Sequence, residues 1–176
     1  MKKVLFVALE SELPWQLLPA DVDVYYTGVG KVNASIVATS LLNWYDADDT
    51  LVINYGSAGG STELLNRLIK CTRFAQGDID CSPIYNKGIT PFDKYGWDTQ
   101  TIDFGGGGEL VTSYDQFQLY PENIVDMEAY AIAKVCKIFD FKFICYKWIS
   151  DDGSPADFLE NHSKGIPYFL EELTKI

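Results

Sequence analysis

The sequence predicts an α/β fold in which residues 1–176 form a single three-layer domain, with a central mixed, mostly parallel sheet flanked by helices. Three observations predict it. Short apolar runs typical of buried strands alternate with segments of helical spacing, glycine-rich turns follow two of these runs, and neither a repeat nor a linker interrupts the chain. Strands that alternate with helices pair mainly in parallel, and the helices then cover both faces of the sheet.

The first third of the chain shows this alternation most clearly. Val4 to Leu9 is a continuous apolar run, which is typical of a strand buried on both faces. Residues 31–44 carry apolar side chains at helical spacing, with the small residues Ala34 and Ala38 available for close packing on a sheet. The expected elements are a strand at 4–9, a short helix opening at 12–15, a strand at 22–27, a helix at 31–44, a strand at 51–54 and a turn at 56–60.

The middle of the chain, from about residue 61 to residue 108, is less regular. Pro83, Pro91 and the four glycines at 105–108 indicate long loops, with one or two strands near Leu68 to Phe74. Regular structure then resumes. The expected elements are strands at 109–113 and 124–127, a helix at 128–139, a strand at 143–149 and a C-terminal helix from Ala156 onward.

The composition excludes several classes of partner. The formal net charge is −11, from 25 acidic and 14 basic residues, and it repels phosphate backbones and anionic membrane surfaces. We therefore expect neither nucleic acid nor a membrane as a partner. The apolar run near the start ends at Glu10, so we interpret it as a strand and expect a cytoplasmic location. The four cysteines form no Cys-x-x-Cys pair and are expected to be reduced, mostly buried thiols.

Neither a metal nor a cofactor is expected. The single histidine, His162, excludes a multi-histidine zinc site and lies in a polar stretch typical of a solvated helix face. Thr27 to Val32 contains Gly-Lys, but the first glycine of a P-loop falls on Tyr25. Gly56 to Gly60 lacks the spacing of a dinucleotide motif. Both turns still offer backbone N–H groups to a small anion, a sugar hydroxyl or a water, or they serve only close packing.

Two acidic segments stand at the edges of predicted elements. Val125 to Ala129 leads from a strand into a helix, and Ile149 to Asp152 ends a strand. Both deliver carboxylates to one rim of the sheet, where α/β folds usually keep their sites. Taken singly, Glu128 is also explained as a partner of the helix dipole and Asp151 as part of a turn. Together they indicate chemistry on a polar, hydroxyl-rich molecule.

At this point the residues show a family resemblance. Five segments, most of them at strand-to-helix junctions, occur in the order seen in the nucleoside phosphorylase superfamily and resemble most its hydrolytic branch, the methylthioadenosine/S-adenosylhomocysteine nucleosidases. They are Ala8-Leu9-Glu10-Ser11-Glu12, Gly28-Val29-Gly30-Lys31-Val32-Asn33-Ala34, Asn54-Tyr55-Gly56-Ser57-Ala58-Gly59-Gly60, Val125-Asp126-Met127-Glu128-Ala129 and Ile149-Ser150-Asp151. The likeness covers residues 1–60 and 109–157 and implies a nucleoside phosphorylase-like fold.

The resemblance also implies roles for single residues. Asp151 resembles the acid that protonates purine N7, Glu12 the base that activates water, and Glu128 the carboxylate that holds the ribose 2′ and 3′ hydroxyls. Such a division suits cleavage of an N-glycosidic bond, which develops positive charge on the sugar and negative charge on the base. The remaining expected site residues are Ser150, which would orient Asp151, together with Ser57, Ala58, Gly59, Met127, Phe117 and Gln118.

Phe117 and Gln118 match the segment that stacks on the base and bonds it through its backbone, although a core position is the commoner place for a single Phe. Tyr114 stands where the family pattern has glycine, a departure that can narrow or reshape the base site. The resemblance further implies a small-molecule purine nucleoside as ligand and a homodimer as the assembly. The 5′ substituent is not indicated by any residue.

The predicted function is a purine nucleosidase acting on an adenine nucleoside such as 5'-methylthioadenosine or S-adenosylhomocysteine. Phosphorylases of this superfamily need arginines near both glycine turns, and this chain has none before Arg67. Glu12 would repel phosphate but suits a water nucleophile. Since Lys31 is still available to an anion, a phosphate-dependent phosphorylase is the alternative enzyme. A nucleoside-binding protein whose catalysis has decayed is the non-enzymatic alternative.

Overall fold

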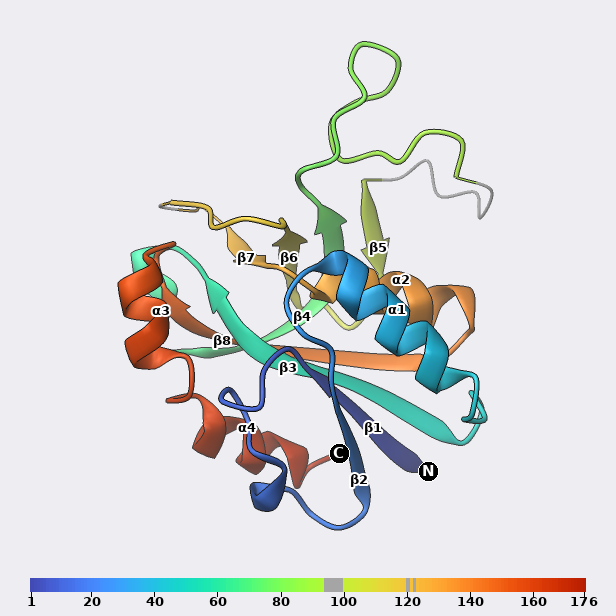
Figure 1. Ribbon diagram of the computed structural model, residues 1–176, viewed down its shortest axis with the longest axis vertical. Helices are drawn as coiled ribbons and strands as arrows, with labels where there is room; N and C mark the ends of the chain where they lie inside the picture. Colours follow the sequence, from blue (N-terminus) through green and yellow to red (C-terminus); the bar gives the residue numbers. More distant parts are fainter. Residues whose placement is uncertain (94–99, 120, 122) are drawn as a thin grey trace.

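An eight-stranded mixed sheet runs through the described part of the chain (Figure 1). The structure is a computed structural model in which residues 1–93, 100–119, 121 and 123–176 are described. The strands follow the order β2-β1-β3-β7-β6-β4-β5, and β8 pairs with both β3 and β4. Their bounds are β1 Lys2–Val7, β2 Val22–Tyr26, β3 Thr50–Gly59, β4 Leu68–Gln76, β5 Thr101–Asp103, β6 Glu109–Ser113, β7 Ile124–Asp126 and β8 Lys142–Asp151.

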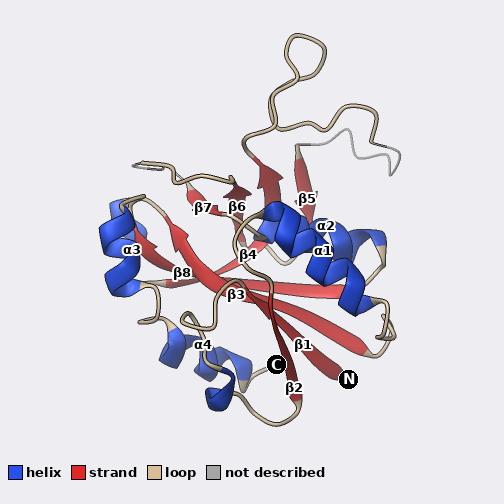
Figure 2. Ribbon diagram, in the orientation of Figure 1, coloured by secondary structure: helices blue, strands red, loops and turns tan. Residues whose placement is uncertain are grey.

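Helices cover both faces of this sheet (Figure 2). The helices are α1 Lys31–Leu42, α2 Ala129–Ile138, α3 Pro155–Asn161 and α4 Ile166–Leu173. Val4 and Phe6 of β1 belong to the core cluster shared with α1 and α2, whereas Leu5 and Val7 belong to the cluster that includes Phe169 of α4. Successive residues of a strand face opposite sides, so this continuous apolar run feeds two cores. The predicted three-layer α/β class is confirmed.

Most predicted strands and helices are present, and parallel pairs outnumber antiparallel pairs among the described strands. The turn predicted at 56–60 is wrong, because β3 continues through Gly59 while β8 pairs alongside it. The helix predicted to open at 12–15 is wrong as well. Only a 3₁₀ turn at Trp15–Leu17 forms, since Glu12 closes a turn by donating its N–H to Leu9 O at 3.0 Å.

The C-terminal region forms two helices where one was predicted. A break at 162–165 separates α3 from α4. Gly165 lies so close to Trp148 that a Cβ on it would be 2.5 Å from the Trp148 Cγ atom. The chain therefore turns tightly against β8 at this glycine before α4 begins.

Three of the four cysteines, Cys71, Cys136 and Cys145, are buried, and all four are free thiols, as predicted. No helix in the described ranges has both the length and the apolar character needed to cross a membrane.

A buried ion pair joins β7 to β8. The Lys147 ammonium lies 2.8 Å from Asp126 Oδ2, and both side chains are almost fully shielded from solvent. Asp126 also accepts hydrogen bonds from the Ser113 hydroxyl of β6 and from the backbone N–H groups of Glu128 and Ala129 where α2 begins. Burial alone would raise the pKa of Asp126, but the Lys147 ammonium and these donors hold that pKa below its ordinary value. The pair thus fixes β6, β7, β8 and α2 relative to one another.

Removing the cation should leave a buried carboxylate without its counter-charge. Lys147→Met is expected to lower the free energy of unfolding by about 3–5 kcal/mol. Urea denaturation at neutral pH measures this loss. Lys164→Met is the control, because Lys164 pairs with Glu160 on the exposed surface and should change stability little. Equal stabilities of the two variants would contradict the structural importance given to the buried pair.

Candidate active site

A cavity of about 260 Å³ opens at the edge of the sheet where β1, β3, β7 and β8 end. Nine of the ten predicted site residues line it, and they come from five separate segments of the chain. These residues are Glu12, Ser57, Ala58, Gly59, Phe117, Gln118, Met127, Glu128 and Asp151. The motif order that suggested a site in the sequence therefore corresponds to a single cavity in space.

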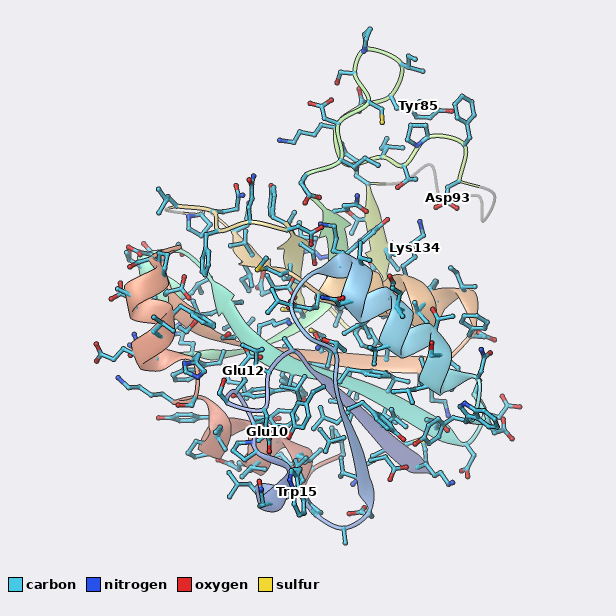
Figure 3. All side chains as sticks on the ribbon, in the orientation of Figure 1. Glu10, Glu12, Trp15, Tyr85, Asp93 and Lys134 are labelled. Carbon is cyan, nitrogen blue, oxygen red and sulfur yellow. The ribbon has the colours of Figure 1, made fainter. Side chains whose placement is uncertain are left out.

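Glu12 is held from both sides by donors. Its side chain projects toward β3 (Figure 3), where Oε1 accepts hydrogen bonds from Ser57 N at 2.8 Å and from the Ser57 hydroxyl. The other oxygen, Oε2, accepts from Leu9 N at 3.1 Å. The residue is only 3% exposed, although it lines the cavity. The turn after β1 and the end of β3 thus orient a nearly buried carboxylate at the cavity wall.

The Glu128 carboxyl group accepts a hydrogen bond from the backbone of the first glycine turn. Glu128 lies at the N-terminus of α2, and its Oε1 accepts a hydrogen bond from Gly30 N at 2.9 Å. Gly30 has φ of 95°, a conformation that favours glycine. Burial and the neighbouring Asp126 charge raise the pKa of Glu128 to about 8. The sequence left open whether this turn binds an anion, a hydroxyl or a water or serves only close packing; in the structure its Gly30 amide holds an acidic group of the same chain.

Asp151 ends β8 with both carboxylate oxygens bonded. Oδ2 accepts from the Ser150 hydroxyl at 2.6 Å, and Oδ1 accepts from Gly153 N at 2.7 Å. Gly60 N also donates to the Asp151 carbonyl at 2.9 Å, which ties this turn to β3. Ser150 is buried and is the one predicted site residue that does not line the cavity. Ser150 was predicted to orient Asp151, and its hydroxyl donates to that carboxylate.

The turn after Asp151 packs against the predicted base-binding segment. A Cβ on Gly153, which has φ of 95°, would lie 1.9 Å from the Gln118 carbonyl oxygen. Phe117 is 50% exposed and lines the cavity, so it is not a core residue, and its ring meets Phe158 edge-on at 6.0 Å between centroids. Two aromatic rings and a backbone segment therefore form one side of the cavity.

Tyr114 does not narrow this cavity. Its ring instead covers Gly77, where a Cβ would lie 2.0 Å from the Tyr114 Cζ atom. The bulky residue at a position where the family pattern has glycine is accommodated because residue 77 has no side chain. His162 does not line the cavity; its ring stacks on the lining residue Phe158 from the end of α3. Within the described residues, no cluster of three or more His, Cys, Asp or Glu side chains is arranged to hold a metal ion.

Two residues were not anticipated from the sequence as parts of the site: Asp126, which belongs to the lining, and Lys147 behind it. Asp126 and Lys147 form the buried pair described above, and Lys147 also faces Glu12. The position that a Cβ of Gly56 would occupy is 3.5 Å from both Glu12 Oε1 and Lys147 Nζ. One signal was available: a lysine inside the apolar strand 143–149 requires a buried partner. Nothing in the sequence identified that partner.

Phe158 of the cavity lining was also not predicted, because no recognisable sequence motif includes it.

The arrangement suits a small molecule with a flat face and several hydroxyls. Three carboxylates from three segments, those of Glu12, Glu128 and Asp151, surround a mostly apolar cavity. Phe117 offers a ring for stacking at its open side. Ligand cavities in proteins commonly combine such apolar walls with a few oriented polar groups.

Comparisons with known proteins agree with this geometry. No protein-family model matches the chain. The chain is 31% identical to the 5'-methylthioadenosine/S-adenosylhomocysteine nucleosidase of Haemophilus ducreyi over 182 residues, which cover 88% of this chain and 77% of that relative. It is also 31% identical to the nucleosidase of the same name from Anoxybacillus flavithermus, covering 75% of this chain and 68% of that protein.

Solved structures show the same fold. The Helicobacter pylori nucleosidase of this name, in a mutant form with 5'-methylthioadenosine in its active site, has a TM-score of 0.84 at 20% identity, covering 99% of this chain and 98% of that one. The Colwellia psychrerythraea nucleosidase in complex with adenine has a TM-score of 0.76 at 21% identity, covering 92% and 88% of the two chains. Because it is 31% identical to the Haemophilus ducreyi protein over most of both chains, the chain belongs to the family of 5'-methylthioadenosine/S-adenosylhomocysteine nucleosidases.

Proposed function

We propose that this protein hydrolyses the N-glycosidic bond of an adenine nucleoside, with 5'-methylthioadenosine and S-adenosylhomocysteine as the substrates to test first. The observation that carries the proposal is the meeting of Glu12, Glu128 and Asp151 around one cavity, each with its carboxyl group oriented by hydrogen bonds. The relatives from this family are named as nucleosidases that act on these two compounds. A purely nucleoside-binding protein would not need all three acids oriented in this way.

In the proposed reaction, adenine stacks on Phe117 and faces Asp151. As the bond to the ribose breaks, Asp151 gives a proton to purine N7, so that the base leaves as a neutral molecule. Ser150 and Gly153 support this role because they fix the two oxygens of the acid. The backbone near Gln118 lies against Gly153, which supports a link between base recognition and the orientation of the acid.

Glu12 and Glu128 act on the other half of the substrate. Glu128 accepts hydrogen bonds from the ribose hydroxyls, while Glu12 positions and activates the attacking water. The negative charge of these groups also stabilises the cationic sugar of the transition state. Lys147 supports this arrangement because its ammonium pairs with Asp126. The ammonium and the Glu12 carboxylate also both lie 3.5 Å from the position that a Cβ of Gly56 would occupy.

The charges around the cavity favour water over phosphate as the nucleophile. Of the described residues that line the cavity, none is arginine or lysine. Lys31, the cation available to a phosphate in the alternative function, binds Asp78 at 2.7 Å and Asp115 at 2.9 Å instead. A phosphate dianion would therefore meet acidic side chains and neither lysine nor arginine in this described lining. Hydrolysis is the reaction that these contacts support.

We further propose a cytoplasmic homodimer in which residues 1–176 act as one domain. Ile36 on the outer face of α1 is 59% exposed, and Ile84 and Phe92 in the loop that projects beyond the sheet (Figure 1) are 78% and 83% exposed. Exposed apolar side chains of this size favour burial against a second copy. Free thiols favour a reducing compartment.

The mass in solution tests the assembly. Light scattering on eluting protein is expected to give twice the chain mass of 19.8 kDa. Ile36→Glu should shift the mass toward one chain, because the new charge would be buried without a partner. A single-chain mass for the unaltered protein would contradict the homodimer.

The role of Asp151 is tested by a substitution that removes its ability to donate a proton. Asp151→Asn is expected to lower kcat by roughly 10²- to 10⁴-fold while 5'-methylthioadenosine still binds, because the amide keeps the shape of the side chain but cannot transfer the proton. Chromatography of released adenine gives the rate and calorimetry gives the binding. Asp140→Asn is the matched control, since Asp140 is exposed at a left-handed position that asparagine accepts.

Adding phosphate should leave the rate of adenine release by the unaltered protein unchanged. Release that requires phosphate would replace hydrolysis by phosphorolysis. Near-normal hydrolysis by Asp151→Asn would remove Asp151 from the mechanism.

The pH dependence follows from Glu128. Its raised pKa of about 8 means that the free protein holds Glu128 as the acid below that pH and as the carboxylate above it. Since the carboxylate can accept from both ribose hydroxyls, kcat/KM should rise between pH 6 and pH 9 with an apparent pKa near 8. Glu128→Gln should lower kcat/KM and abolish this rise. A rise of the same shape in both proteins would assign it to another group.

A further inference from the structure

Three charged residues outside the cavity lining join three segments of the chain, and we call them the Lys31 cluster: Lys31, Asp78 and Asp115. The Lys31 ammonium lies 2.7 Å from Asp78 Oδ2 and 2.9 Å from Asp115 Oδ2. Lys31 N also donates to Asp115 Oδ1 at 2.9 Å, and Asp115 N donates to Asp78 Oδ2 at 2.8 Å. Two carboxylates therefore share one ammonium and are linked to each other through a backbone donor.

The Lys31 cluster is well enough shielded for its charges to matter. The Lys31 side chain is 13% exposed and that of Asp78 is 24% exposed, whereas Asp115 is 46% exposed, so the shielding lies around the ammonium and Asp78. Burial lowers the pKa of Lys31, but its bonds to the two aspartates outweigh this effect and raise that pKa overall. Charge pairs that are partly buried are screened by salt less than surface pairs.

The cluster lies directly behind two walls of the cavity. Asp115 begins the base-binding segment, which continues through Gln116, Phe117 and Gln118 along the lining. Lys31 follows Gly30, the residue whose amide holds Glu128. The two walls approach each other here, because a Cβ on Gly30 would lie 3.4 Å from Asp115 Oδ1. A shift of Asp115 would therefore move the base-binding segment relative to the sugar-binding carboxylate.

We propose that Lys31 is a positioning residue for adenine recognition, which it supports by holding Asp78 and Asp115 together without touching the ligand. Without the ammonium, the two carboxylates repel each other and Asp115 moves away from α1, carrying Phe117 and Gln118 with it. The inference rests on the proposed function, because that function places adenine on this segment. It gives the Lys-containing glycine turn a role other than binding phosphate.

Three variants test the proposal by their affinity for adenine alone. Lys31→Met is expected to raise the Kd for adenine, measured by calorimetry, by about tenfold to a hundredfold, a range typical of small misplacements of binding groups. The KM for 5'-methylthioadenosine should rise with it, while kcat stays within about fivefold, because the hydrogen bonds that orient Glu12 and Asp151 do not involve the cluster. Lys31→Arg keeps the cation and should restore the Kd to within about threefold.

A second route keeps the test valid if Lys31→Met does not fold. Asp78→Asn removes one charge but keeps an oxygen acceptor for Lys31 and Asp115, so it should raise the adenine Kd in the same direction by a smaller factor. In the double variant Lys31→Met/Asp78→Asn the repulsion is absent, so adenine should bind better than to Lys31→Met alone. Lys175→Met is the control and should leave the Kd unchanged, because Lys175 pairs with Glu171 on the exposed surface and does not line the cavity.

The outcomes separate this inference from the proposed function. A folded Lys31→Met protein with an adenine Kd within twofold of the unaltered protein would overturn the positioning role, and so would a Lys31→Arg protein as weak as Lys31→Met. If the unaltered protein binds adenine but hydrolyses neither nucleoside, the proposed reaction fails while calorimetry still decides the role of Lys31. An unaltered protein that does not bind adenine would overturn both.

Discussion

The ion pair between Lys147 and Asp126 is the constraint on which the site depends. An unpaired charge in this position would cost several kcal/mol, so each side chain requires the other. Asp126 uses its remaining acceptor capacity on Ser113 and on the first amides of α2, which places Glu128 at the start of that helix. Lys147 lies on β8 four residues before Asp151 and faces the space beside Glu12. One buried pair thereby relates all three cavity carboxylates.

Bringing three acids to one cavity is unfavourable by itself, and the backbone offsets much of that cost. Glu12 accepts from two backbone amides, Glu128 from one and Asp151 from one. Such donors stabilise carboxylates without adding mobile cations to the cavity. This arrangement explains two of the glycines: Gly30 and Gly153 both have positive φ, which aims their N–H groups at an acid.

The sequence predicted the layers and most elements because apolar runs and helical spacing are local signals. The error at Gly56 to Gly59 has a non-local cause, since glycines signal a turn but pairing with β8 keeps this segment extended. The acids were found because a family likeness set them in order. Neither the pairing of Lys147 with Asp126 nor that of Gly30 with Glu128, which lies 98 residues away, follows from a local pattern. These contacts required the tertiary structure.

The two lysines behind the cavity explain how this site selects its nucleophile. Lys147 is held by Asp126, and Lys31 is held by Asp78 and Asp115, so both cations stabilise the protein's own carboxylates. The field inside the cavity therefore comes from a lining that carries acidic side chains and, among the described residues, neither lysine nor arginine. Such a field repels a phosphate dianion and attracts a sugar that becomes cationic as its bond to the base breaks. The same placement of charge that orders the fold thus favours hydrolysis.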